Sequence, residues 1–368
     1  MDNNFDNNFS NNSNDNNDRY ETPTSASAGM RILNMLEEGK INAAEATELL
    51  KQFKEAPEPQ DGALSHIGSI IGEALGEVED FFNFTREHKV EFTMPAAQSI
   101  GSVRLLGKNG KVELESYNGQ EVRIECKYKP KKEHLPPVMG DDPSAIELLY
   151  DASKMRSMSI KCLIPNIFVD DIVLESRNGA IRLNRINSNS VQLTTKNSDI
   201  KMKDVKSNEL VARTRNAPIS AERITADTLS LYSSNSSIQA SRIKAVDAKL
   251  MTSNAKVDVE YHDVERLVLS TSNAAIKLDR VDMEQPWPTE RVIEAETSNA
   301  AIKMTLPDVG FDIEAETSNA RIDIDLPFFP PVSGKFLKGR SQDYNERDRQ
   351  LRLKLSTSNG GIKLESAK

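Results

Sequence analysis

Residues 191–240 read VQLTTKNSDIKMKDVKSNELVARTRNAPISAERITADTLSLYSSNSSIQA and place an asparagine every 19 residues, at positions 197, 216 and 235. The spacing continues on both sides, and the asparagine returns at longer intervals near the end of the chain. Its positions are Asn178, Asn197, Asn216, Asn235, Asn254, Asn273, Asn299, Asn319 and Asn359. A repeat of constant length is typical of a solenoid, in which one small unit stacks on the next.

The residues around each asparagine keep a period of two. Apolar side chains precede it by six and four positions, as at Leu210 and Ala212, and follow it by three and five, as at Ile219 and Ala221. This alternation predicts two short strands per repeat, each with one apolar face. We therefore predict a mainly β fold, a parallel β-solenoid with rungs of about 19 residues over residues 88–366. A propeller blade needs about 40 residues, and antiparallel hairpins in a sandwich do not require a constant spacing.

Two interpretations fit the asparagine at the corner of each repeat. Asparagine tolerates a left-handed backbone, and its amide can hydrogen-bond the asparagines of the rungs above and below, forming a ladder. Alternatively, the amides point outward as an array that contacts a ligand. We favour a structural ladder for all nine positions. Because both sites read TSNA, we expect Asn299 and Asn319 to be neighbours in it.

Composition limits the classes of partner. The 368 residues carry a formal net charge of −9, which argues against general binding to nucleic acid or anionic lipid. There is neither a basic and apolar leader nor a run of about 18 apolar residues, so we expect no signal peptide and no transmembrane helix. These features indicate a protein that is cytoplasmic or peripheral to the membrane. The alternation around Cys126 and Cys162 indicates buried small hydrophobic side chains rather than a disulfide.

The residues before the repeats follow different patterns. Residues 1–28 are rich in asparagine, with nine in the first 17 positions, and are expected to form a disordered tail. Residues 29–56 fit a small helical hairpin, in which Asn42 and Glu45 have the spacing of a capping box. Residues 60–86 fit an amphipathic linker helix. Its acidic polar face favours packing against protein or self-association over contact with anionic lipid.

Catalysis, cofactor binding and metal binding find no support in the sequence. The four histidines have no metal-ligand spacing with Cys, Asp or another His. Outward positions one rung apart mix sign and type: Arg182, Lys201, Ser220, Gln239, Asp258 and Lys277. We therefore predict no catalytic residue, no cofactor and no metal site. A glycan-active β-helix enzyme would need clustered outer carboxylates and is the less favoured alternative.

Two segments interrupt the repeat. Residues 129–157 have a basic start, several prolines and a stretch that could form a short helix. Residues 326–350 bring Phe328, Phe329 and Phe336 near three prolines. Loops that interrupt a solenoid often carry binding. The alternative is that both segments cap or cover the rod.

Two stretches resemble known families. ILNMLEEGKINAAEATELLKQF, residues 32–53, resembles the SHOCT-like helical hairpin that opens the LiaX-like cell-envelope-stress proteins of Firmicutes. SIKCLIPNIFVDDIVLESRNGAIRL, residues 159–183, resembles a bacterial family of adhesin-like domains, for which a β-solenoid is expected. The second resemblance extends over about 88–366.

Together the resemblances imply a non-enzymatic binding or scaffold protein of the bacterial cell-envelope stress response. The resemblance to the adhesin-like family also allows a location at the cell surface. The alternative is a cytoplasmic regulator that binds its partner through the helices of residues 29–86. The partner would be a protein or an envelope component, and self-association through residues 60–86 or the solenoid ends is a further expectation.

Overall fold

The computed structural model describes residues 86–131, 136–281, 290–327, 329 and 333–367. The chain divides into two compact units, Met1–Asn83 and Phe84–Lys368, and every described residue belongs to the second. The expected tail at 1–28, hairpin at 29–56 and linker helix at 60–86 therefore lie outside the described residues. The one exception is Arg86, which forms a bend rather than helix.

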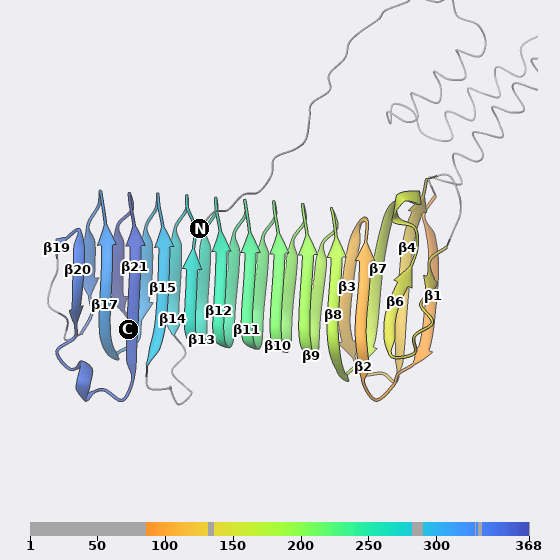
Figure 1. Ribbon diagram of the computed structural model, residues 1–368, viewed down its shortest axis with the longest axis horizontal. Helices are drawn as coiled ribbons and strands as arrows, with labels where there is room; N and C mark the ends of the chain where they lie inside the picture. The colour runs from red at the N-terminus through yellow and green to blue at the C-terminus, as the bar shows by residue number, and fades with distance from the viewer. Residues whose placement is uncertain (1–85, 132–135, 282–289, 328, 330–332, 368) are drawn as a thin grey trace, which may run out of the picture. The chain divides into compact units, whose positions relative to one another are not determined.

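The second unit is a rod of strands stacked in parallel (Figure 1). Its middle consists of β8 (Phe168–Ser176), β9 (Ile181–Thr195), β10 (Ile200–Thr214), β11 (Ile219–Ser233), β12 (Ile238–Thr252) and β13 (Val257–Ser270). From β9 to β13 the register pairs each residue with the one 19 positions on, such as Ile200 with Ile219 and Ile219 with Ile238. The prediction of a mainly β fold with parallel stacked strands is confirmed.

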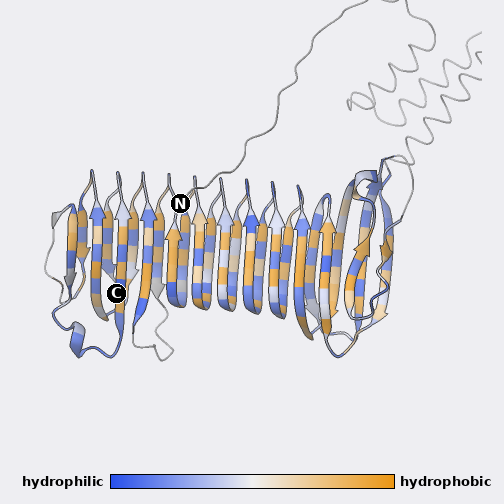
Figure 2. Cartoon of the chain, viewed as in Figure 1, coloured by the Kyte–Doolittle hydropathy of each residue, from blue (hydrophilic) through white to orange (hydrophobic). Residues whose placement is uncertain are grey.

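Each strand turns one face into the core. Along β10 burial alternates with exposure, and Leu210 and Ala212 are fully buried, as are Leu229 and Leu231 one rung on. The same columns appear as apolar bands across the stack in Figure 2. Each fully buried Ile or Leu contributes roughly 1.5–3 kcal/mol, so the columns are the main source of stability.

The rungs turn at two kinds of corner. The asparagine corner is a bend spread over three residues, such as 196–198. The second corner lies inside continuous strands, at Arg185, Asp204, Arg223 and Arg242, whose φ angles are 53° to 56°. A left-handed backbone was therefore the wrong reason for the repeated asparagine. Among the described residues, only Asn109 combines a corner asparagine with a positive φ, of 50°.

The N-terminal end of the rod combines parallel and antiparallel strands. It contains β1 (His88–Pro95), β2 (Ile100–Gly107), β3 (Asn109–Tyr117), β4 (Glu121–Pro130) and β7 (Met155–Pro165). β2 and β3 form the first rung, because they pair in parallel with β8 and β9. β7 pairs in parallel with β3 and antiparallel with β4, which pairs with β1. Cys126 and Cys162, on β4 and β7, are buried free thiols.

The segment 129–157 folds onto this end. After β4 it contributes β5 (Val138–Met139), β6 (Ala145–Leu149) and the 3-10 turn η1 (Ala152–Lys154) before β7 begins. β6 pairs in parallel with β2, and the Tyr150 hydroxyl donates to the Leu106 carbonyl. Within its described residues the only helical part is η1, so the segment covers the first rung rather than forming a separate helix.

The C-terminal end departs from sequential stacking. It contains β14 (Ile276–Val281), β15 (Arg291–Thr297), β16 (Ile302–Leu306), β17 (Gly310–Thr317), β18 (Ile322–Asp325), β19 (Ser333–Gly334), β20 (Phe336–Arg340), η2 (Tyr344–Glu346), β21 (Gln350–Thr357) and β22 (Ile362–Ser366). β15 and β16 pair with β21 and β22, not with β17 and β18. The last rung of the sequence is therefore inserted between two earlier ones. β20 and β19 then close the end in antiparallel pairing with β17 and β18.

One column of charges on the outer face fits this order. Lys354 on β21 pairs in register with Glu294 on one side and with Glu314 on the other. If β15 met β17 directly, Glu294 and Glu314 would be adjacent, and like charges on neighbouring strands are destabilising. In this column the inserted rung places a cation between two carboxylates, whereas on β22 it brings Lys363 beside Lys303.

Candidate interaction surface

A row of asparagine side chains runs along one edge of the rod. From Asn178 onward, each Nδ2 donates to the Oδ1 of the asparagine in the preceding rung of the stack, over distances of 2.6 to 2.8 Å. The order is Asn109, Asn178, Asn197, Asn216, Asn235, Asn254, Asn273, Asn299, Asn359 and Asn319. The ladder thus begins one member earlier than the nine proposed residues. Asn299 and Asn319 are not neighbours as expected, because Asn359 lies between them.

Buried hydroxyl groups hold the asparagine corner in place. The hydroxyl two positions before the asparagine bonds the bend of the preceding rung, as where Thr214 Oγ1 donates to the Ser198 carbonyl at 3.2 Å. The Asn216 backbone N–H donates to the Lys196 carbonyl at 3.0 Å. With its backbone fixed in this way, each asparagine side chain lies exposed on the edge while bonding its neighbours. The geometry therefore allows both interpretations of the asparagine, because the side chains form a structural ladder and also face outward as an array.

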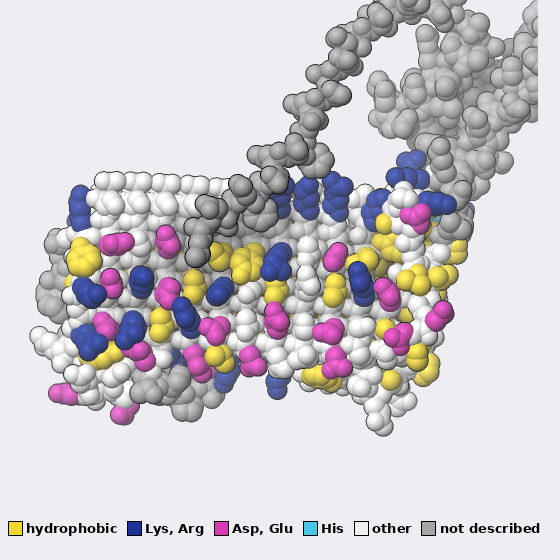
Figure 3. All heavy atoms as spheres, viewed as in Figure 1, with side chains coloured by type: hydrophobic (Ala, Val, Ile, Leu, Met, Phe, Trp, Pro, Cys, Tyr) yellow, Lys and Arg dark blue, Asp and Glu magenta, His cyan; other side chains and the backbone are white. Residues whose placement is uncertain are grey.

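Three cations stand beside the ladder, and we call Arg177, Lys196 and Arg215 the basic row. Each directly precedes a ladder asparagine in consecutive rungs and is exposed. Lys and Arg side chains gather along the edge where β9 and β10 end (Figure 3). Sequence reasoning missed this row because it compared only one outward column. Reading the residue before each asparagine as a column would have shown it.

Several other outward charges near these rungs are neutralised locally. Arg182 Nη2 lies 2.8 Å from Asp199 Oδ2, and Arg223 Nη2 lies 2.9 Å from Asp204 Oδ2. The hydrogen bond from Arg223 lowers the pKa of Asp204. In the part of the chain that the structure describes, no carboxylate pairs in this way with the basic row.

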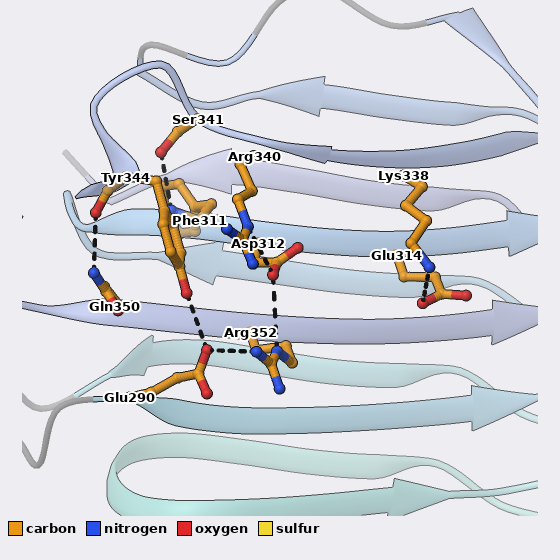
Figure 4. Close-up of polar contacts among 10 residues, drawn as sticks. All are labelled: Glu290, Phe311, Asp312, Glu314, Lys338, Arg340, Ser341, Tyr344, Gln350 and Arg352. Carbon is orange, nitrogen blue, oxygen red and sulfur yellow. Dashed lines mark hydrogen bonds and ion pairs between the residues drawn. The ribbon is translucent and has the colours of Figure 1, made fainter.

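A separate polar network ties the C-terminal segment to the rod (Figure 4). Arg352 Nη2 lies 3.0 Å from Glu290 Oε1, and the Tyr344 hydroxyl donates to the same oxygen at 2.9 Å. Arg340 Nε donates to Asp312 Oδ2 at 3.1 Å, and the Arg340 guanidinium lies 4.8 Å from the centre of the Tyr344 ring. Burial, followed by the bond to Glu290, raises the pKa of Tyr344. These contacts give the segment 326–350 a structural role at the end of the rod.

No group of three or more His, Cys, Asp or Glu side chains within the described residues is placed to hold a metal ion. None of the helices in the same part of the chain is long and apolar enough to span a membrane. The asparagine ladder and the basic row form a continuous polar edge along the rod.

Residues 30–58 match the sequence profile of a SHOCT-like domain. This confirms the resemblance of the N-terminal segment, which the sequence placed at 29–56. No curated protein is significantly similar in sequence to the chain.

Several solved structures are similar in part to the rod. A "putative adhesin" from Parabacteroides distasonis is 9% identical, covers 75% of this chain and 97% of its own, and has a TM-score of 0.43. A "putative adhesin" from Bacteroides fragilis is 13% identical over 76% and 97% of the chains, with a TM-score of 0.33. A "putative cell adhesion protein" from Clostridium sporogenes is 10% identical over 76% and 100%, with a TM-score of 0.24. At TM-scores this low the likeness carries no argument about function.

Proposed function

We propose that the protein is a non-enzymatic binding or scaffold protein of the bacterial cell envelope, built on a β-solenoid with 19-residue rungs. The observation that supports it is the exposed edge, where identical side chains repeat from rung to rung without convergent reactive groups. Such an edge offers many equivalent contacts to an extended partner. The rigid apolar columns beneath keep the contacts in register.

The SHOCT-like segment supports a link to the envelope stress response, as in LiaX-like proteins, with residues 30–58 recruiting a partner or joining the rod to one. A cytoplasmic regulator that binds through this segment is the second candidate. A glycan-active enzyme receives less support, because outward carboxylates such as Asp199 and Asp204 are engaged by arginines.

Co-sedimentation of the purified full chain with bacterial envelope fragments tests the proposal. Two preparations, cell wall stripped of membrane and membrane vesicles, separate the possible surfaces. We expect the chain to pellet with at least one preparation, and to do so equally well when residues 30–58 are deleted. Absence of pelleting with both would overturn the proposal. Pelleting that requires residues 30–58 would favour the regulator instead.

A further inference from the structure

The basic row is an exception within the repeat. In six other rungs the residue before the ladder asparagine is serine: Ser234, Ser253, Ser272, Ser298, Ser318 and Ser358. The three cations are direct neighbours, because the Lys196 N–H donates to the Arg177 carbonyl at 3.1 Å and the Arg215 N–H donates to the Lys196 carbonyl at 3.2 Å. Adjacent members are therefore about 4.8 Å apart along the rod.

Folding does not require these charges. Like charges in adjacent strands repel and destabilise a sheet, and serine fills the same position in most rungs. Lys108 holds the same position one rung before Arg177, but its ammonium is engaged within the protein, because it donates to the Ala152 carbonyl. The row thus keeps three exposed charges together at a cost to stability, which indicates a role in binding an anion.

The neighbouring groups are suited to sugar rings. Each ladder amide uses one N–H and its oxygen in the ladder, which leaves a second N–H on the exposed side chain. Arg213 shares an outward face with Arg215, and its guanidinium lies 5.3 Å from the centre of the half-buried Tyr232 ring. Cations and amide donors therefore lie along one edge, and Arg213 with the Tyr232 ring lies on the strands next to it.

The dimensions favour a chain with sparse charge. Each strand of duplex nucleic acid carries a phosphate about every 3.4 Å along the helix axis, which is closer than the roughly 4.8 Å between adjacent cations of the row. A lipid surface would need a broad basic face, whereas the row is one residue wide. A polysaccharide with one carboxylate per ring has spaced charges and many hydroxyl groups for the amides.

We propose that Arg177, Lys196 and Arg215, with the ladder amides beside them, bind a linear anionic polysaccharide along the edge of the rod. This inference rests on the proposed binding function and names the chemical class of its ligand. The carboxylates would meet the three cations, and the ring hydroxyl groups would accept from the free amide N–H groups of Asn178, Asn197 and Asn216.

Binding of fluorescently labelled polygalacturonate to the full chain tests the proposal, with neutral dextran, a thymidine oligonucleotide and phosphatidylglycerol vesicles as comparison ligands. The variant Arg177→Ser/Lys196→Ser/Arg215→Ser introduces the residue that other rungs carry at this position, so its thermal unfolding should match the parent. The control Lys206→Ser/Lys249→Ser/Lys303→Ser removes three exposed lysines away from the row.

We expect the row variant to bind polygalacturonate at least about tenfold more weakly, and the control variant to retain most of the affinity. Equal losses in both variants, or no binding by the parent, would overturn the inference. Tighter binding to the oligonucleotide or to the vesicles would overturn it too. If the row variant still pellets with envelope fragments, an anionic polysaccharide bound by the row is not what the protein binds there. The proposed binding function would nevertheless stand.

Discussion

The side-chain amide of Asn359 donates to Oδ1 of Asn299 at 2.8 Å, although 60 residues separate the two. Asn319, much nearer in sequence, lies one rung further along and donates to Asn359 at 2.7 Å. The C-terminal rung is thus held between two rungs that follow each other in the chain. Its position depends on contacts with both, and those contacts can be tested separately.

The first prediction concerns the charge on the inserted rung. Lys354→Glu should lower the free energy of unfolding by about 1 kcal/mol, because it would place a third carboxylate between Glu294 and Glu314. Urea unfolding at low salt measures the change, and high salt should reduce it.

In the matched control the change in the free energy of unfolding should have the opposite sign. Lys303 pairs in register with Lys277 on one side and Lys363 on the other. Lys303→Glu should therefore raise stability at low salt, although the substitution is chemically the same. A fall of equal size in both variants would show that the charge pattern does not set the order of the rungs.

The second prediction concerns the ladder. Asn235→Ala removes two amide hydrogen bonds, to Asn216 at 2.7 Å and from Asn254 at 2.8 Å, and should cost about 1 kcal/mol. Asn319→Ala removes only the terminal bond to Asn359 and should cost about half as much. Chemical denaturation of both variants measures the difference. Equal effects would indicate that the ladder bonds contribute nothing beyond the local corner.

The third prediction concerns a close backbone approach in the inserted rung. A Cβ at Gly360 would lie 1.8 Å from the Ala300 carbonyl oxygen, whereas one at Gly361 would lie 3.3 Å from that of Arg321. Gly360→Ala should therefore lower stability by about 2 kcal/mol or more. Gly361→Ala should have a small effect. Thermal unfolding of the pair distinguishes them, and similar melting temperatures would contradict the insertion of this rung.

The fourth prediction concerns pH. Burial raises the pKa of the Cys126 thiol from 9.0 to about 12, and burial also raises the pKa of Cys162. The folded values lie above the unfolded ones, so these thiols stabilise the fold fully below the unfolded pKa. That contribution is lost as pH rises above about 9.

Urea unfolding at pH 7, 9 and 10 should show a decline that is smaller in Cys126→Ala/Cys162→Ala, despite its lower stability at pH 7. Neither thiol should react with a thiolate-specific reagent at pH 8 until the protein unfolds. Rapid labelling of the folded chain would contradict the burial of both residues.

Most of the fold could be predicted from the local periodicity of the sequence. The alternation around Leu210 and Ile219 is a property of neighbouring residues, so it predicted the strands, their inward faces and their parallel stacking. The left-handed corner at Arg185 and Arg223 was hidden, because neither residue type signals a positive φ. The basic row can be predicted from the sequence, but only when the residues that precede each ladder asparagine are compared with one another.

The sequence by itself determined the rung, because one rung is built from short-range patterns of apolar and polar residues. Tertiary structure alone decided which rung lies beside which at the C-terminal end. The inward columns of rungs 291–306, 310–325 and 350–366 differ in size, because Leu355 of the inserted rung lies in register between Ala295 and Ala315. Lys354 between two glutamates, Leu355 between two alanines and Gly360 against Ala300 all fit the observed order. These contacts join residues far apart in the chain, so they form only after the chain has folded back on itself.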